Sequence, residues 1–100
     1  MDNDLQLART VSEAALATAG VYSLGSGRYV EAATYGPGEK VMGVVVGPDE
    51  VTVHIVVRYP LPEPILALAE RVRERVAQKA EGRATVVVVE DLEVAQDENL

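Results

Sequence analysis

Residues 50–81 read EVTVHIVVRYPLPEPILALAERVRERVAQKAE, and this stretch decides the fold. Apolar side chains at every second position of 51–59 are typical of a strand with one buried face. The prolines at 60, 62 and 64 end that strand and exclude helix before about residue 63, because proline lacks a backbone N–H and restricts the residue before it. Apolar residues then recur at helical spacing to about Ala80. A strand, a proline corner and an amphipathic helix therefore form the centre of a small α+β domain.

The two faces of the 51–59 strand carry different side chains. One face is predicted to pack against the helices and holds Val51, Val53, Ile55, Val57 and Tyr59. The other face mixes apolar and polar groups, which suits a protein contact better than a reaction. This candidate interaction face consists of Thr52, His54, Val56 and Arg58. The following helix is predicted to bury a stripe made of Ile65, Leu68, Ala69, Val72 and Val76.

The remaining elements complete an α-β-β-β-α-β order. They are a helix at 4–18, a turn-rich connector at 21–28, and strands at 29–35, 40–46 and 84–92. The three early strands are expected to form an antiparallel meander. The last strand follows a helical crossover and is expected to run parallel to strand 51–59, beside it or beside strand 40–46. The prediction is one domain over residues 1–100, with a four-stranded, mostly antiparallel sheet and both helices on one face.

Composition limits the functional classes. One hundred residues form one domain, with an ordered core expected at about 5–94 and frayed ends at 1–3 and 95–100. The net charge of −7 argues against free-standing nucleic-acid binding and against adsorption to an anionic membrane. Because the chain has no cysteine, disulfides, thiol catalysis and cysteine-based zinc sites are excluded. We expect no metal and no cofactor.

No feature of the sequence predicts direct membrane insertion. Residues 1–20 lack the apolar core of a signal peptide, and no apolar run reaches the length of about 18 residues that a membrane span needs. The absence of cysteine is compatible with a cytoplasmic location. Any association with a membrane is therefore expected to occur through a partner.

No catalytic set is recognisable. His54 is the only histidine, and no other ligand flanks it as a metal site requires. The hydroxyls of Ser12, Ser23 and Ser26 have no base near them in sequence except this histidine, so they give a weak triad signal. Glu90 and Asp91 are adjacent on a predicted strand and are expected to point to opposite faces, which excludes a carboxylate pair.

Two further motifs each have two interpretations. The turn Gly25-Ser26-Gly27-Arg28 could bind an anion through Arg28, or could be a flexible connector, since it lacks the context of a nucleotide-binding loop. On the 65–80 helix, Arg71, Arg75 and Lys79 form a column of cations. This column is either a solvated face, balanced by Glu70–Arg73 and Arg71–Glu74 pairs, or a docking stripe for an acidic partner or for a second copy's acidic tail.

The chain resembles the bacterial alkaline shock protein family, also called the general or envelope stress response family. Members carry a strand of the form V-x-V-x-x-x-V-x-Y, a corner, and a helix with valine spacing. The matching residues here are Val51, Val53, Val57 and Tyr59, followed by Ile65, Ala69, Val72 and Val76. AALATAGV at 14–21 is similar to the family's first helix, and TVVVVEDLEV at 85–94 to its last strand. Departures are a shorter glycine-rich segment, a more proline-rich corner and no basic extensions.

The resemblance implies a non-enzymatic, cytoplasmic scaffold or adaptor in cell-envelope stress or homeostasis. Its expected partners are a small membrane-anchor protein, a related family member or further copies of the chain. Two alternatives stay open from the residues themselves. One is a small-ligand-binding or enzymatic domain that uses the face with His54 and Arg58. The other is an RNA-binding module of the KH kind, although the chain lacks a GXXG clamp and stacking aromatics on a strand.

Overall fold

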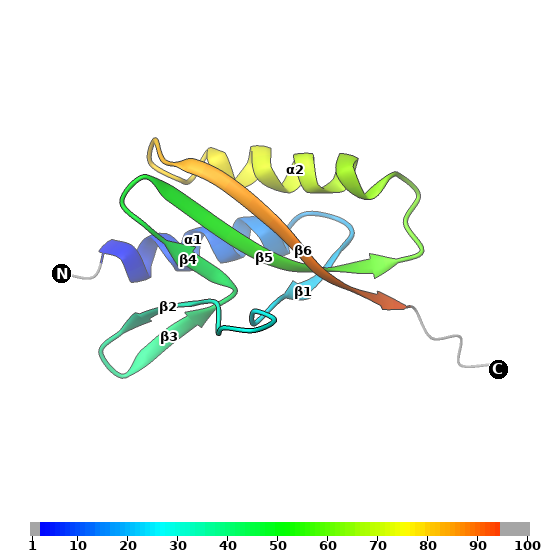
Figure 1. Cartoon of the computed structure of the whole chain (residues 1–100). Helices are drawn as coiled ribbons and strands as arrows, with labels where there is room; N and C mark the ends of the chain where they lie inside the picture. Colours follow the sequence, from blue (N-terminus) through cyan, green and yellow to red (C-terminus); the bar gives the residue numbers. More distant parts are fainter. Residues whose placement is uncertain (1–2, 95–100) are drawn as a thin grey trace.

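The computed structural model describes residues 3–94 and shows two helices on one face of a four-stranded sheet, with a separate two-stranded hairpin (Figure 1). The α+β class is confirmed, and three of the four strand pairs are antiparallel. The fraying predicted for residues 1–2 and 95–100 lies outside the described residues, whereas Asn3, also predicted to be frayed, is the first residue of α1. The elements are α1 (Asn3–Leu16), β1 (Val21–Leu24), β2 (Ala33–Gly36), β3 (Glu39–Met42), β4 (Val44–Val46), β5 (Glu50–Tyr59), α2 (Ile65–Ala77) and β6 (Ala84–Val94).

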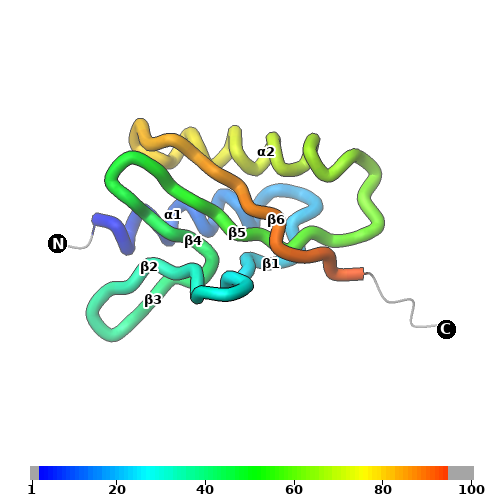
Figure 2. Tube along the Cα trace, viewed as in Figure 1, coloured from blue at the N-terminus to red at the C-terminus, as the bar shows by residue number. Residues whose placement is uncertain are grey.

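Strand β5 is the centre of the sheet. On one side it pairs in parallel with β6 along its whole length, from Glu50 opposite Ala84 to Tyr59 opposite Val94. On its other side, β4 pairs with its first half and β1 with its second half, both antiparallel. The last strand therefore lies beside strand 51–59 and not beside strand 40–46. Figure 2 shows the β5 and β6 traces running side by side in front of the two helices.

The predicted meander is wrong in its details. Residues 21–24, expected in a connector, form a strand of the main sheet, while the strand expected at 29–35 begins only at Ala33 and pairs with β3 in the separate hairpin. The strand expected at 40–46 is divided at Gly43, which has a φ of 87°. A side chain at this position would lie 2.6 Å from the Leu24 Cβ atom. The close approach of β1 therefore requires glycine and breaks the strand.

The core lies between the two helices and the inner face of the sheet. On β5, Val51, Val53, Ile55 and Val57 are fully buried, as the alternation predicts. The helices contribute Leu7, Ala8, Val11, Ala15, Leu68, Val72 and Val76. Tyr59 and Ile65, also predicted for the core, are partly exposed because they flank the proline corner at the end of the sheet. This core of small and branched side chains brings helix and sheet close together without any large aromatic residue.

The proline corner and the start of α2 follow the sequence, whereas both helices end earlier than predicted, α1 at Leu16 instead of residue 18. Pro64 is the N-cap residue of α2 in extended conformation, and the first helical residue is Ile65. α2 ends at Ala77, three residues before the predicted limit, although Ala80 is still fully buried beneath the turn that leads to β6. Neither helix within residues 3–94 is long and apolar enough to cross a membrane.

Candidate interaction face and pocket

The face of the sheet opposite the helices carries the predicted interaction residues. Thr52, His54 and Val56 are half-buried on this outer face, and Arg58 is exposed. Val45 of β4 and Val86 of β6 lie opposite Thr52 on the two sides of β5, and each is 39% exposed. The outer face therefore presents two partly exposed valines, one on each side of Thr52, beside polar groups.

His54 occupies the point where β1 and β4 meet along β5. Its backbone N–H donates to Gly43 O at 2.8 Å, and its carbonyl accepts from Gly25 N–H at 2.8 Å. Both glycines are buried, so two neighbouring chain segments close over the backbone of this residue. These two hydrogen bonds, both on the side of β5 where β1 and β4 lie, fix the backbone position of His54.

Glu90 reaches His54 because β6 contains a bulge. Val89 lies opposite Ile55 and Asp91 lies opposite Val56, so Glu90 is an extra residue without a partner on β5. The register places Asp91 beside the outward Val56, while the Glu90 carboxylate also turns to the outer face. The prediction that these two acids point to opposite faces is therefore wrong, because a bulge interrupts the alternation on which it depended.

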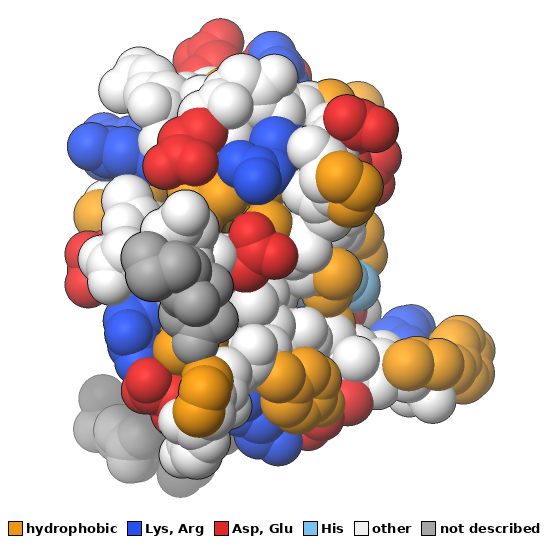
Figure 3. All heavy atoms as spheres, turned by 90° about the vertical axis from the view of Figure 1, so that its left-hand side faces the viewer, with side chains coloured by type: hydrophobic (Ala, Val, Ile, Leu, Met, Phe, Trp, Pro, Cys, Tyr) orange, Lys and Arg blue, Asp and Glu red, His pale blue; other side chains and the backbone are white. Residues whose placement is uncertain are grey.

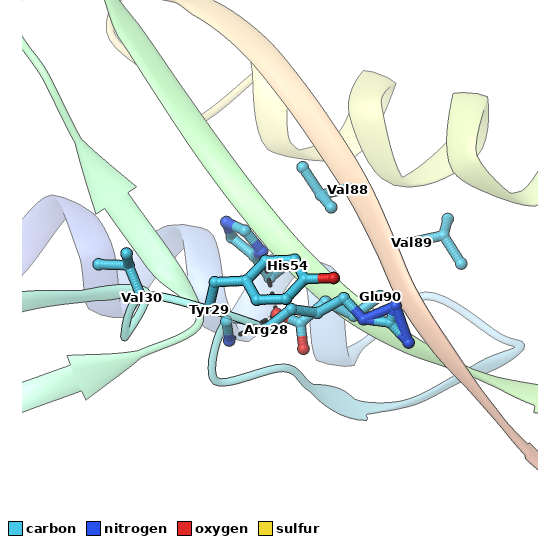
Figure 4. Close-up of a pocket in the computed structure, with 8 residues that line it drawn as sticks. Arg28, Tyr29, Val30, His54, Val88, Val89 and Glu90 are labelled. Atoms are coloured by element: carbon cyan, nitrogen blue, oxygen red, sulfur yellow. Dashed lines mark hydrogen bonds and ion pairs between the residues drawn. The ribbon is translucent and has the colours of Figure 1, made fainter.

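The Glu90 carboxylate joins β5 to the loop that follows β1. Its Oε2 atom lies 3.1 Å from His54 Nδ1 and accepts a hydrogen bond from Gly27 N–H at 2.5 Å. Only 9% of the Glu90 side chain and 19% of the His54 side chain are exposed. Figure 4 shows this pair between β5, β6 and the loop that carries Arg28 and Tyr29. The carboxylate therefore holds the loop against the sheet.

A pocket of about 380 Å³ opens at this junction. Its lining residues are Gly27, Arg28, Tyr29, Val30, His54, Val88, Val89 and Glu90. The imidazole and the carboxylate are the arrangement of a base and its orienting group. No serine, threonine, cysteine or lysine lines the pocket beside them, and its one lining hydroxyl belongs to Tyr29. Residues 3–94 contain no group of three or more histidine, cysteine, aspartate or glutamate side chains that could hold a metal ion.

Residues 26–32 form a tight loop that stands out from the sheet. Ala32 N–H donates to Ser26 O at 2.9 Å and closes the loop, and Gly27 has a φ of 92° that favours glycine. At the tip, Tyr29 is 96% and Val30 is 81% exposed. In Figure 3 the histidine lies on the right-hand side, and hydrophobic and basic side chains project beyond it. The 25–28 turn is therefore part of a loop closed by hydrogen bonds, and Arg28 at its end lines the pocket.

Arg58 turns away from the pocket. Its guanidinium lies over the Tyr22 ring, 5.0 Å from the ring centroid, on the β1 side of the outer face. A cation above an aromatic ring is attracted by the electrons of its face. His54 and Arg58 lie on the same face of β5, as predicted, but only His54 lines the pocket.

The predicted column of cations is divided, and Lys79 lies in the turn after α2 because the helix ends at Ala77. Arg71 is held by an ion pair with Glu63 and by a hydrogen bond to Ala19 O at 3.2 Å, so it faces the end of α1. Arg75 and Lys79 are exposed. The expected Glu70–Arg73 pair forms; its hydrogen bond lowers the pKa of Glu70 and raises the pKa of Arg73.

Glu90, Tyr29 and Val30 are functional candidates that the sequence reading did not select. The sequence did carry a signal for Glu90, because this acid directly follows four valines, at a position where a buried strand usually has an apolar residue. Nothing in the local pattern marked Tyr29 and Val30, because 29–35 read as a strand.

Comparisons of this chain with protein-family models, with curated proteins and with solved structures found no match.

Proposed function

We propose that this protein is a non-enzymatic scaffold or adaptor in cell-envelope stress response or homeostasis, and that it acts by binding other proteins. The observation that carries the proposal is the uncovered outer face of the sheet. Both helices pack on the inner face, while Val45, Val86, Tyr29 and Val30 remain exposed on the other side. Clustered exposed apolar groups with a polar surround are typical of protein interaction sites.

The place of this function in the cell rests on the resemblance to the alkaline shock protein family. We propose a cytoplasmic protein that reaches the membrane through a small anchor protein, or that assembles with related members or with itself. A binding role is supported by the apolar walls of the pocket and by the absence of serine, threonine, cysteine and lysine from its lining residues. The net charge of −7 and the acids on β6 disfavour RNA as the partner.

The test combines a growth phenotype with crosslinking of partner proteins in cells. Deleting the gene in its own bacterium is expected to increase sensitivity to cell-wall antibiotics, and the intact gene restores growth. The double variant Val45→Asp, Val86→Lys is expected to fold, to fail to restore growth and to lose the crosslinked partners of the intact protein. The control variant Glu13→Lys, Glu74→Lys changes exposed helix positions and is expected to restore growth. A deletion without any envelope phenotype contradicts the proposal.

A second candidate function is the binding of a small ligand in the pocket. It is favoured by the volume of about 380 Å³ and by the combination of His54, Glu90 and Arg28 with apolar walls. A screen of small metabolites by NMR distinguishes it from the first. Saturable shifts of the His54 ring and of the 26–32 amides support a ligand site if the amide shifts are lost in His54→Ala. If no compound shifts these signals, the second candidate is wrong.

A further inference from the structure

Strand β6 ends the sheet with an unpaired edge. It runs from Ala84 to Val94, and among the described residues its only strand partner is β5. An unpaired edge exposes a row of backbone N–H and C=O groups that can template another strand. Natural edges are commonly protected by proline, lysine or a bulge. The part from 84 to 89 has none of these, because the bulge occurs only at Glu90.

The outward side chains of β6 change character along the strand. Val86 and Val88 lie on the outer face in the first half, opposite Thr52 and His54. In the second half Asp91 and Glu93 take the outer positions opposite Val56 and Arg58. All of the charged residues from 84 to 94 are acids. A segment lying along this edge would therefore meet apolar groups first and negative charge afterwards.

The acids of the second half are not neutralised within the described part of the chain. No ion pair joins Asp91 or Glu93 to a cation among residues 3–94. Glu93 lies opposite Arg58, but the Arg58 guanidinium is turned towards the Tyr22 ring on the far side of β5. These two carboxylates can therefore receive lysine or arginine from a partner.

The pocket lies beside the same strand. Val88, Val89 and Glu90 of β6 form one of its walls, and the exposed Tyr29 forms another. When a peptide adds to a sheet edge, main-chain hydrogen bonds provide affinity and pockets for alternate side chains provide specificity. An edge and an adjoining pocket on the same face supply both parts.

We propose that β6 receives an extended segment of a partner protein as an additional strand. The segment has apolar side chains at alternate positions beside Val86 and Val88, and lysine or arginine beside Asp91 and Glu93. One of its outward side chains enters the pocket at Glu90. This inference rests on the proposed adaptor function and names the chemistry of the bound partner.

A second copy of the chain fits the edge less well. The β6 strand of a second copy offers valines for the first half, but it carries Glu90, Asp91 and Glu93 and no cation from 84 to 94. It would leave the acidic half of the edge without opposite charge. The acidic surface therefore favours a basic segment over self-association.

The test uses labelled peptides and the intact protein. Each peptide probe has one half in which threonine alternates with valine and one half in which threonine alternates with lysine. Two peptides with these halves in opposite order are synthesised, so that both a parallel and an antiparallel added strand are tested. One order is expected to bind saturably and to slow amide exchange of residues 84–89. Replacing the lysines with glutamates, or methylating the peptide nitrogens, is expected to weaken binding about tenfold or more.

Matched variants separate edge binding from general attraction to a negative protein. The variant Asp91→Lys, Glu93→Lys is expected to bind about tenfold more weakly. The variant Glu13→Lys, Glu74→Lys changes the net charge equally and is expected to bind like the unmodified protein. Three results would overturn the inference. They are equal weakening of peptide binding in both variants, the absence of saturable binding by either peptide, and slowed amide exchange of 84–89 that is caused by self-association. If partners are still recovered in cells after such a result, the adaptor function stands and only the edge is excluded.

Discussion

Replacing Glu90 with alanine tests whether one carboxylate holds the 26–32 loop on the sheet. The substitution removes the acceptor of the Gly27 N–H and the partner of His54. A hydrogen bond to a charged group contributes about 1.5–3 kcal/mol, and deleting the acid also removes the cost of burying it. Because the side chain is only 9% exposed, solvent screens these bonds weakly. We expect the free energy of unfolding to fall by about 2–3 kcal/mol, and the melting temperature by about 10–20 °C.

The assay is urea and thermal unfolding followed by circular dichroism, together with amide hydrogen exchange. The Gly27 and Ala32 amides are expected to exchange faster in Glu90→Ala while those of α2 keep their relative protection. Glu93→Ala, an exposed acid on the same strand, is the control and is expected to change stability by less than about 0.5 kcal/mol. A cycle with His54→Ala measures the coupling, expected at about 0.5–3 kcal/mol. If Glu90→Ala matches its control, the carboxylate does not hold the loop.

Four further predictions concern the fold. Leu68→Ala removes a fully buried side chain of α2 and is expected to lower the free energy of unfolding by about 3–5 kcal/mol in urea titrations; a loss below 1 kcal/mol would contradict this packing. Gly43→Ala adds a side chain at a φ of 87°, and we expect a loss of about 2 kcal/mol or more, whereas unchanged stability would show that the backbone there can relax. The Thr85 hydroxyl oxygen is buried without a hydrogen-bond partner, so Thr85→Val is expected to leave the melting temperature unchanged or to raise it, and a clear decrease would indicate a missed partner. The hydrogen bond from Arg73 lowers the pKa of Glu70 in the folded state, so the stabilisation by this pair is present above the ordinary glutamate pKa and is lost as the pH falls through the lowered value. Glu70→Gln is expected to flatten the dependence of the free energy of unfolding on pH below about pH 5, and identical pH dependences of the two proteins would refute the pairing.

The sequence predicted the elements whose pattern is local and strong. β5 begins within a residue of the expected position, because its alternation is continuous and prolines mark its end. The start of α2 follows from Pro64 in the same way. Four of the five inner residues of β5 were also correct, since a strand with one buried face must alternate; the exception is Tyr59 at the strand end.

Other features depend on distant parts of the chain and could not be read locally. Residues 21–24 are short and flanked by glycine and serine, and they become a strand only because β5 offers them an edge. The break at Gly43 arises from the approach of Leu24, a residue far from it in sequence. The outward turn of Glu90 depends on a bulge in a parallel pair, which no spacing rule reveals. The candidate site was therefore predicted for His54 and missed for the groups around it.

The end-to-end arrangement of β1 and β4 has a consequence for how the chain can vary. Both strands run in the same direction along one side of β5, and Gly25 and Gly43 meet at His54. They amount to one interrupted strand into which residues 26–42 are inserted. The two ends of this insertion are neighbours in space, so changes in the length of its turns need not alter the register of β5. Chains of this architecture could thus differ in the segment inserted between β1 and β4 while keeping the same central strand.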